Sequence, residues 1–242
     1  MWARADLKER AKFAFKRNYV ISVIAGLILA FSTGELFSRS SSSRGTSSVG
    51  NAIATGGISD DLYALLTLIA GIAIIAVVIG IVINIFLLAP LAVGGYRFFI
   101  KNRIAPSNLN EFGFAFKNGY MNVVKTQFLT SVMIFLYTLL LIIPGIMKMY
   151  SYRLVPYILA ENPRIEPFDA MKLSSEMMRG NRFDAFVLDL SFILWDMLTG
   201  ITFGIAGVLY VFPYKCATNA ELYAVLKENA PYDYSGNSSY DA

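Results

Sequence analysis

The stretch LYALLTLIAGIAIIAVVIGIVINIFLLAPLAVGGY, residues 62–96, contains no charged side chain. Its 35 residues lie between Asp61 and Arg97. A helix needs roughly 20 apolar residues to cross a bilayer core of about 30 Å. A soluble domain has no reason to carry an uncharged segment of this length. The chain is therefore predicted to be an integral membrane protein.

The composition supports a membrane protein of a single domain. Of the 242 residues 56% are hydrophobic and 16% are charged, whereas soluble domains carry about 25% charged residues. The net charge is +4, and the charged residues flank the apolar segments. Basic residues at such positions usually set the topology and contact anionic headgroups. We therefore expect the lipid bilayer, and not a nucleic acid, to be the main partner.

Histidine is absent and Cys216 is the single cysteine. The sequence therefore excludes Ser-His-Asp and Cys-His catalysis, zinc sites built on histidine and an intramolecular disulfide. Neither a cluster of metal ligands nor a nucleophile beside a base is visible in the sequence. We expect a protein that is not an enzyme and that holds no cofactor and no metal.

The predicted fold class is all-α, a polytopic transmembrane bundle of about six membrane helices plus an amphipathic N-terminal helix. The apolar runs that predict the crossings are residues 18–37, 62–91, 126–143, 146–160, 185–198 and 205–223. Pro144 and Gly145 interrupt one run, and we interpret this helix-breaking pair as a tight turn between two crossings. The alternative is one long kinked helix.

The polar segments complete the predicted single membrane domain, residues 1–228. Residues 1–17 form the amphipathic helix, which either lies in the interface or extends the first crossing. Residues 38–59 are serine- and glycine-rich and are predicted to be a flexible loop outside the membrane. Residues 161–184 form a cytoplasmic linker with a short helix that begins at Pro167. Residues 229–242 are a polar tail, predicted to be disordered and cytoplasmic.

The distribution of basic residues predicts the topology. With both termini inside, 17 of the 21 lysines and arginines fall on the inner side, and the outer loop holds only Arg39 and Arg44. Basic residues accumulate on the cytoplasmic side of membrane helices. The sequence therefore predicts a multi-pass protein of the cytoplasmic membrane with both termini in the cytoplasm.

Charged side chains inside the predicted crossings are the candidate site, and they are Lys148, Arg153, Asp189 and Asp196. A charge at the centre of a bilayer costs about 2.5–3.5 kcal/mol on insertion scales, so such residues pair or line a wet path. Matching their depths predicts the pairs Lys148–Asp196 and Arg153–Asp189. Asn84 could add hydrogen bonds. The cluster is either a polar path or ligand pocket, or a structural clamp between short helices, and Lys148 and Asp196 could instead snorkel to the interface.

Several motifs resemble an uncharacterised family of integral membrane proteins from Gram-positive bacteria, domain of unknown function nine-seven-five. The resemblance covers nearly the whole chain and rests on Met1–Lys8, Ile143–Tyr152, Val155–Pro163, Ala170–Ser174, Met178–Gly180, Phe186–Phe192 with Trp195, Pro213–Tyr214 and Ala220–Tyr223. It implies a membrane fold and no established activity. Arg153 departs from the small polar residue that the family pattern implies there, so a site built on Arg153 is not expected to be family-wide.

These patterns leave three function classes open. The first is a transporter-like or membrane-homeostasis protein that binds a lipid or an amphipathic peptide between its helices. The second is a structural or interaction subunit that recruits a protein partner at the cytoplasmic face, and the third is a membrane enzyme acting on lipid. A polar cavity that reaches Arg153 and Asp189 would favour the first class, whereas a dry core with an exposed apolar groove would favour the second.

Overall fold

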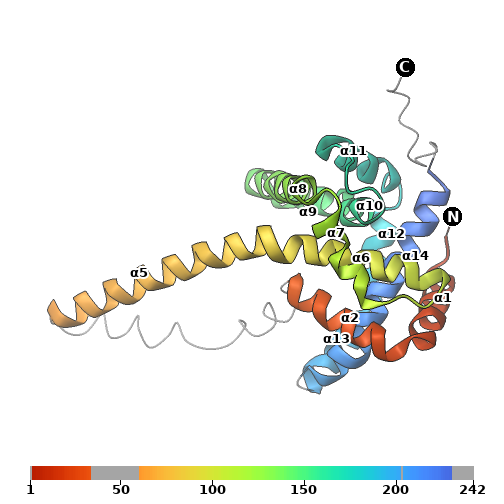
Figure 1. Ribbon diagram of the computed structural model, residues 1–242, viewed down its shortest axis with the longest axis horizontal. Helices are drawn as coiled ribbons and strands as arrows, with labels where there is room; N and C mark the ends of the chain where they lie inside the picture. Colours follow the sequence, from red (N-terminus) through yellow and green to blue (C-terminus); the bar gives the residue numbers. More distant parts are fainter. Residues whose placement is uncertain (1, 34–59, 203, 231–242) are drawn as a thin grey trace.

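The computed structural model describes residues 2–33, 60–202 and 204–230, and the regular structure in these ranges is helical (Figure 1). The predicted outer loop 38–59 and the tail from residue 231 onward lie outside the described residues. In chain order the elements are α1 (Arg4–Arg17), α2 (Tyr19–Ser32), α5 (Asp60–Ile83), the π-helical turn η2 (Asn84–Leu88), α6 (Ala89–Ile104), the 3-10 turn η3 (Leu109–Gly113), α7 (Phe114–Lys117), α8 (Tyr120–Leu140), α9 (Ile142–Ser151), α10 (Val155–Glu161), α11 (Pro167–Met177), α12 (Arg182–Leu190), α13 (Ile193–Ile201), the π-helical turn η4 (Gly207–Val211) and α14 (Phe212–Glu228).

The body of the molecule is the part in which α1, α2, α6, α10 and α14 pack against one another. Its core side chains are fully buried, among them Phe98 and Phe99 of α6, Leu159 of α10 and Leu222 of α14. Gly94 allows α6 to approach η3 closely, because a Cβ at this position would lie 2.6 Å from the Cα of Phe112. The body therefore resembles the interior of a soluble protein in its packing.

The chain bends by 108° between α1 and α2, so α1 does not extend the first predicted crossing. Buried Asn102 of α6 stabilises the bend, since its amide donates to the carbonyl of Ala14 at 3.1 Å and to the hydroxyl of Ser22 at 3.3 Å. Its side-chain oxygen accepts from Asn18 at 3.0 Å. The predicted helix is present, and the apolar residues of its predicted face, such as Phe15, are buried against α14 and α6.

The expectation of about six full crossings is not supported. In the part of the chain that the structure describes, two helices are long and apolar enough to span a membrane, the continuous helix Tyr63–Ile104 and the helix Tyr120–Leu140, or up to three if the bent pair α1–α2 counts as one span. The remaining apolar segments are broken, since α9 has 10 residues and α12 and α13 have 9 each. A full crossing needs roughly 20 residues.

The chain reverses between α8 and α9 at Leu141, which is extended with φ −158° and ψ 137°. The predicted turn at Pro144 and Gly145 is therefore displaced by three residues, because both lie within the first turn of α9. Proline is tolerated there because the backbone N–H groups in the first turn of a helix have no acceptor within the helix. Gly145 allows the two helices to approach, because a Cβ on it would lie 2.6 Å from the Cα of Thr138.

The predicted linker 161–184 does contain a short helix, α11, which begins at Pro167 as expected. It ends at Met177, and Gly180 follows with φ +79°, a conformation that favours glycine. The inner face of α11 packs against α8, α9 and α10. The linker therefore packs onto the body through the contact of α11 with α10.

Candidate functional site

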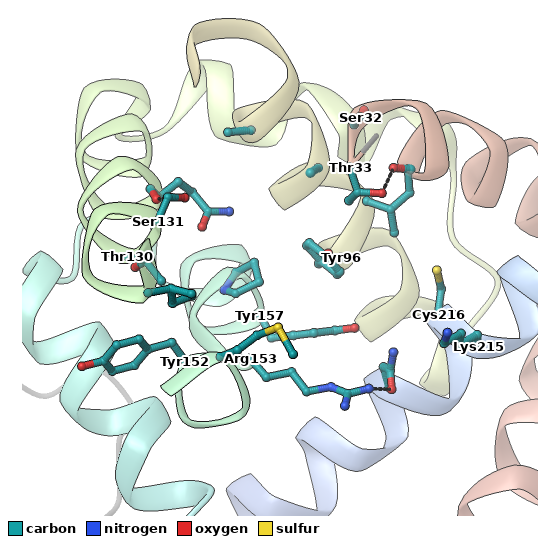
Figure 2. Close-up of a pocket in the computed structure, with 18 of the residues that line it drawn as sticks. Ser32, Thr33, Tyr96, Thr130, Ser131, Tyr152, Arg153, Tyr157, Lys215 and Cys216 are labelled. Atoms are coloured by element: carbon teal, nitrogen blue, oxygen red, sulfur yellow. Dashed lines mark hydrogen bonds between the residues drawn. The ribbon is translucent and has the colours of Figure 1, made fainter. Parts of the chain in front are cut away.

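A cavity of about 520 Å³ lies between α2, η2, α6, α8, α9 and α14. Three of the predicted site residues line it, namely Asn84, Arg153 and Asp189. Figure 2 shows Arg153 between a wall that carries Thr130 and Ser131 and a wall that carries Lys215 and Cys216. The cavity therefore reaches the charged pair.

Arg153 and Asp189 form a bidentate ion pair, as their predicted depths indicated. The Nη1 of Arg153 donates to Oδ2 of Asp189 at 2.6 Å and its Nη2 donates to Oδ1 at 2.8 Å. The side chains are 17% and 28% exposed, so the cavity still reaches them. This prediction is confirmed, and Asp189 faces protein.

Two further side chains complete the cluster. Arg153 also donates from Nη2 to Oδ1 of Asn219 at 2.8 Å, and the hydroxyl of Tyr150 donates to Oδ2 of Asp189 at 3.0 Å. The sequence analysis missed Asn219. The available signal was a polar amide within an apolar run, which indicates an interior position in a membrane helix.

The break between α9 and α10 positions Arg153. Pro156 has no backbone N–H and cannot donate to the carbonyl of Tyr152, which weakens the helix at this point. The hydroxyl of Ser174 on α11 satisfies the break, since it donates to the carbonyl of Ser151 at 2.7 Å and accepts from the N–H of Leu154 at 3.1 Å. The residues between α9 and α10 can thus leave the helix and present a guanidinium to the cavity.

The predicted pair Lys148–Asp196 is wrong. The ammonium of Lys148 instead donates to the hydroxyl of Tyr152 at 3.3 Å and lies 4.8 Å from the ring centre of Tyr137. Asp196 pairs with Lys215 of α14 at 3.8 Å. The reason is the break between α12 and α13, after which α13 packs against η4 rather than continuing along α9.

Polar side chains from the middle of α8 form one wall of the cavity. Gln127, Thr130 and Ser131 line it, and Thr130 is the central residue of this candidate span. The two hydroxyls satisfy their own helix, because Thr130 donates to the carbonyl of Thr126 at 2.7 Å and Ser131 donates to that of Gln127 at 2.9 Å. Their oxygens remain available as acceptors.

Two π-helical turns, each followed by a proline, lie beside the cavity. Asn84 of η2 lines the cavity, and so does Phe212, the residue directly after η4. Pro90 leaves the carbonyl of Phe86 without its helical donor, and the hydroxyl of Tyr120 donates to it at 2.7 Å. Pro213 does the same to Leu209, whose carbonyl accepts from Tyr19 at 3.2 Å. Such turns are frequent at functional sites.

The chemistry of the cavity suits binding. It offers a paired cation and anion, hydroxyl and amide groups, and apolar surface from residues such as Ile134 and Met149. Within the ranges that the structure describes, no three histidine, cysteine or acidic side chains come together as a metal site. The cavity can therefore accommodate a molecule that has both a polar and an apolar part.

Comparison with known proteins adds a family and no activity. The model of a family described as "Protein of unknown function (DUF975)" matches residues 62–230, which is more than half of the chain. The match includes most of α5 and the residues Arg153, Asp189 and Asn219. No curated protein and no solved structure matches the chain.

Proposed function

We propose a function from one premise, which is that the chain belongs to the family of proteins of unknown function DUF975. Membership supplies no substrate, so the proposal rests on the cavity. The protein binds a membrane lipid in this cavity and serves a transporter-like or membrane-homeostasis role that is not enzymatic. The observation that carries this proposal is a polar cavity of about 520 Å³ that reaches the Arg153–Asp189 pair from beside the middle of α8.

The proposed site lies in a cytoplasmic-membrane protein whose shorter helices enter the bilayer as partial spans. Broken helices are tolerated at membrane depth where they line a cavity or are buried in protein. The tips of the broken segments support this placement, because their apolar side chains are exposed: Ile142 and Ile143 in α9, Leu194 and Ile201 in α13, and Ile205 before η4. Six apolar segments then reach the membrane, although in the part of the chain that the structure describes two or three helices are long enough to cross it.

Both termini are proposed to be cytoplasmic. The start of α1 and the end of α14 lie on the side of the molecule away from the free end of α5 (Figure 1), and basic residues concentrate near these two ends and in the linker. Single cysteines at Ser42 and Ser239, in a Cys216→Ala background, can be labelled with an impermeant thiol reagent in intact cells. Labelling at Ser42 alone is expected, and labelling at Ser239 alone would invert the topology.

The alternative role, recruitment of a protein partner at the cytoplasmic face, predicts a dry core. The cavity therefore supports ligand binding over recruitment. The test uses the full chain in detergent with a fluorescent phospholipid analogue. Ser131→Trp, which projects a large ring from the cavity wall, is expected to weaken binding at least tenfold. Leu136→Trp, on the face of the same helix opposite to the cavity and 51% exposed, is the matched control.

Equal lipid binding by the wild type and both variants would contradict the proposal. A second outcome is that Ser131→Trp abolishes the binding of a fluorescent amphipathic peptide and leaves lipid binding unaffected. This result would show that the cavity binds an amphipathic peptide and not a lipid. Each variant is first compared with the wild type in a thermal melt, so that loss of binding is separated from loss of folding.

A further inference from the structure

The charges at the polar end of the cavity cancel. Two cations line it, Arg153 and Lys215, and each has a carboxylate partner, Asp189 at 2.6 Å and Asp196 at 3.8 Å. A ligand with a net charge would leave one buried charge without a partner, which is costly in a low-dielectric site. The site therefore favours a ligand whose own charges sum to zero.

The Arg153–Asp189 pair can open toward such a ligand without leaving either side chain unsatisfied. If the carboxylate turns away, Arg153 keeps its hydrogen bond to Asn219 at 2.8 Å. Asp189 keeps its hydrogen bond from the hydroxyl of Tyr150 at 3.0 Å. Both groups thus have a second partner that is already in place. A binding site that exchanges an internal ion pair for a ligand requires such second partners.

We propose that this pair recognises a zwitterionic headgroup made of a phosphate and a primary ammonium, an inference that rests on the proposed lipid-binding function. The guanidinium of Arg153 offers parallel N–H donors to two phosphate oxygens, the geometry in which arginine binds phosphate best. The carboxylate of Asp189 accepts hydrogen bonds from the ammonium. The acyl chains lie along the apolar wall at Ile134 and Met149.

The aromatic residues of the cavity argue for a primary ammonium over a quaternary one. A quaternary ammonium carries no hydrogen-bond donor and is recognised by aromatic rings that surround it. Here two of the lining rings pack on each other, since Tyr157 is 3% exposed and lies 4.6 Å from Tyr96 between ring centres. The ring of Tyr150 already has the guanidinium of Arg153 at 5.7 Å. The hydroxyl of Tyr152 accepts from Lys148 at 3.3 Å. We therefore assign the ammonium to the carboxylate of Asp189.

The test measures the binding of fluorescent phosphatidylethanolamine, phosphatidylcholine and phosphatidylglycerol to the full chain in detergent. The wild type is expected to bind the ethanolamine lipid at least fivefold more tightly than the other two. Asp189→Asn is expected to abolish this preference, so that the ethanolamine lipid binds no more tightly than phosphatidylcholine. Tyr150→Phe, which keeps the ion pair, is expected to reduce the preference about twofold and guards against misfolding of Asp189→Asn.

Equal binding of the three lipids by the wild type, or an unchanged preference in Asp189→Asn, would overturn the inference. If Ser131→Trp still abolishes binding in that case, lipid binding stands and only the headgroup assignment fails. Competition by soluble glycerophosphoethanolamine tests the source of the headgroup. Displacement at concentrations comparable to the lipid supports recognition of the same zwitterion in free form, and weak displacement supports a membrane lipid.

Discussion

The body and the helix α5 are both rich in apolar residues, yet they use them differently. In the body Leu159 is 0% exposed, whereas Ile75 of α5 is 61% exposed although both are large aliphatic side chains. Figure 1 shows α5 extending away from the packed helices. A bilayer can cover an apolar helix as well as protein can, so hydrophobicity alone does not distinguish the two regions. The difference implies that the body is stabilised by its own packing and α5 by its surroundings.

Polar contacts mark the body in a second way. Arg17 donates to the carbonyls of Asn102 at 2.7 Å and Ile104 at 3.1 Å and so satisfies the C-terminal end of α6. Arg103 pairs with buried Glu221 of α14 at 3.0 Å. The central part of α5, by contrast, is uncharged from Leu62 to Ile83. The body therefore has directional interactions that fix its helices relative to one another.

The largest difference is expected from a matched truncation in the two regions. Leu159→Ala leaves a cavity in the body and should lower the free energy of unfolding by about 3 kcal/mol. Ile75→Ala should lower it by less than about 0.5 kcal/mol, because exposed positions contribute little. Thermal melts of the purified protein in detergent measure both. Equal losses would mean that α5 packs against protein in the native assembly and would break the comparison.

A smaller loss is expected when the polar anchor of the body is removed. Asn102→Ala removes the donor to the carbonyl of Ala14 and the acceptor of the buried N–H of Ser107, so stability should fall by about 2–3 kcal/mol. Asn229→Ala removes an exposed hydrogen bond to the carbonyl of Val225 and should cost under about 0.5 kcal/mol. If both variants melt like the wild type, the bend is held by packing alone.

The fold was predictable where a single residue determines the backbone. The start of α11 at Pro167 and the all-helical class follow from local rules. The number of full spans was not predictable. The break between α9 and α10 is completed by the hydroxyl of Ser174 on α11, a distant partner that the sequence does not place. The π-helical turns were also missed, since a proline indicates a lost donor but not the tyrosine that replaces it.

The site was predictable to the level of depth and charge. Arg153 and Asp189 could be matched because both lie on segments that run side by side. Asp196 could not, because the break after α12 turns α13 away and brings Lys215 within reach. Periodicity along a helix indicates which side chains share a face, but it cannot identify a partner across a break.

The Arg153–Asp189 pair lies where the two regions meet, and its removal should have an intermediate effect. Asp189→Asn leaves the guanidinium with a neutral amide, and since the pair is partly exposed we expect a loss of about 1–2 kcal/mol. The exchanged pair Arg153→Asp with Asp189→Arg should recover part of it. No recovery, with each single variant as stable as the wild type, would exclude a structural contribution and leave ligand binding as the role of the pair.

The smallest effect is expected at the surface of the body, where Glu111 accepts from Lys101 at 2.6 Å and from Arg97 at 2.9 Å. Burial raises the pKa of this carboxyl, but the hydrogen bonds from Lys101 and Arg97 outweigh burial and hold the pKa below its usual value. A lowered pKa in the folded state means that the stabilisation is present above the unfolded pKa of about 4.3 and is lost as the pH falls through the folded pKa.

Melting curves between pH 7 and pH 3 should therefore show a decline at the acidic end that is shallower in Glu111→Gln. The difference should be about 0.5–1 kcal/mol, as for other partly exposed ion pairs. Glu228→Gln, at the exposed end of α14, is the control and should follow the wild type. A decline that persists unchanged in Glu111→Gln would show that the Glu111 ion pairs do not cause it and would contradict this prediction.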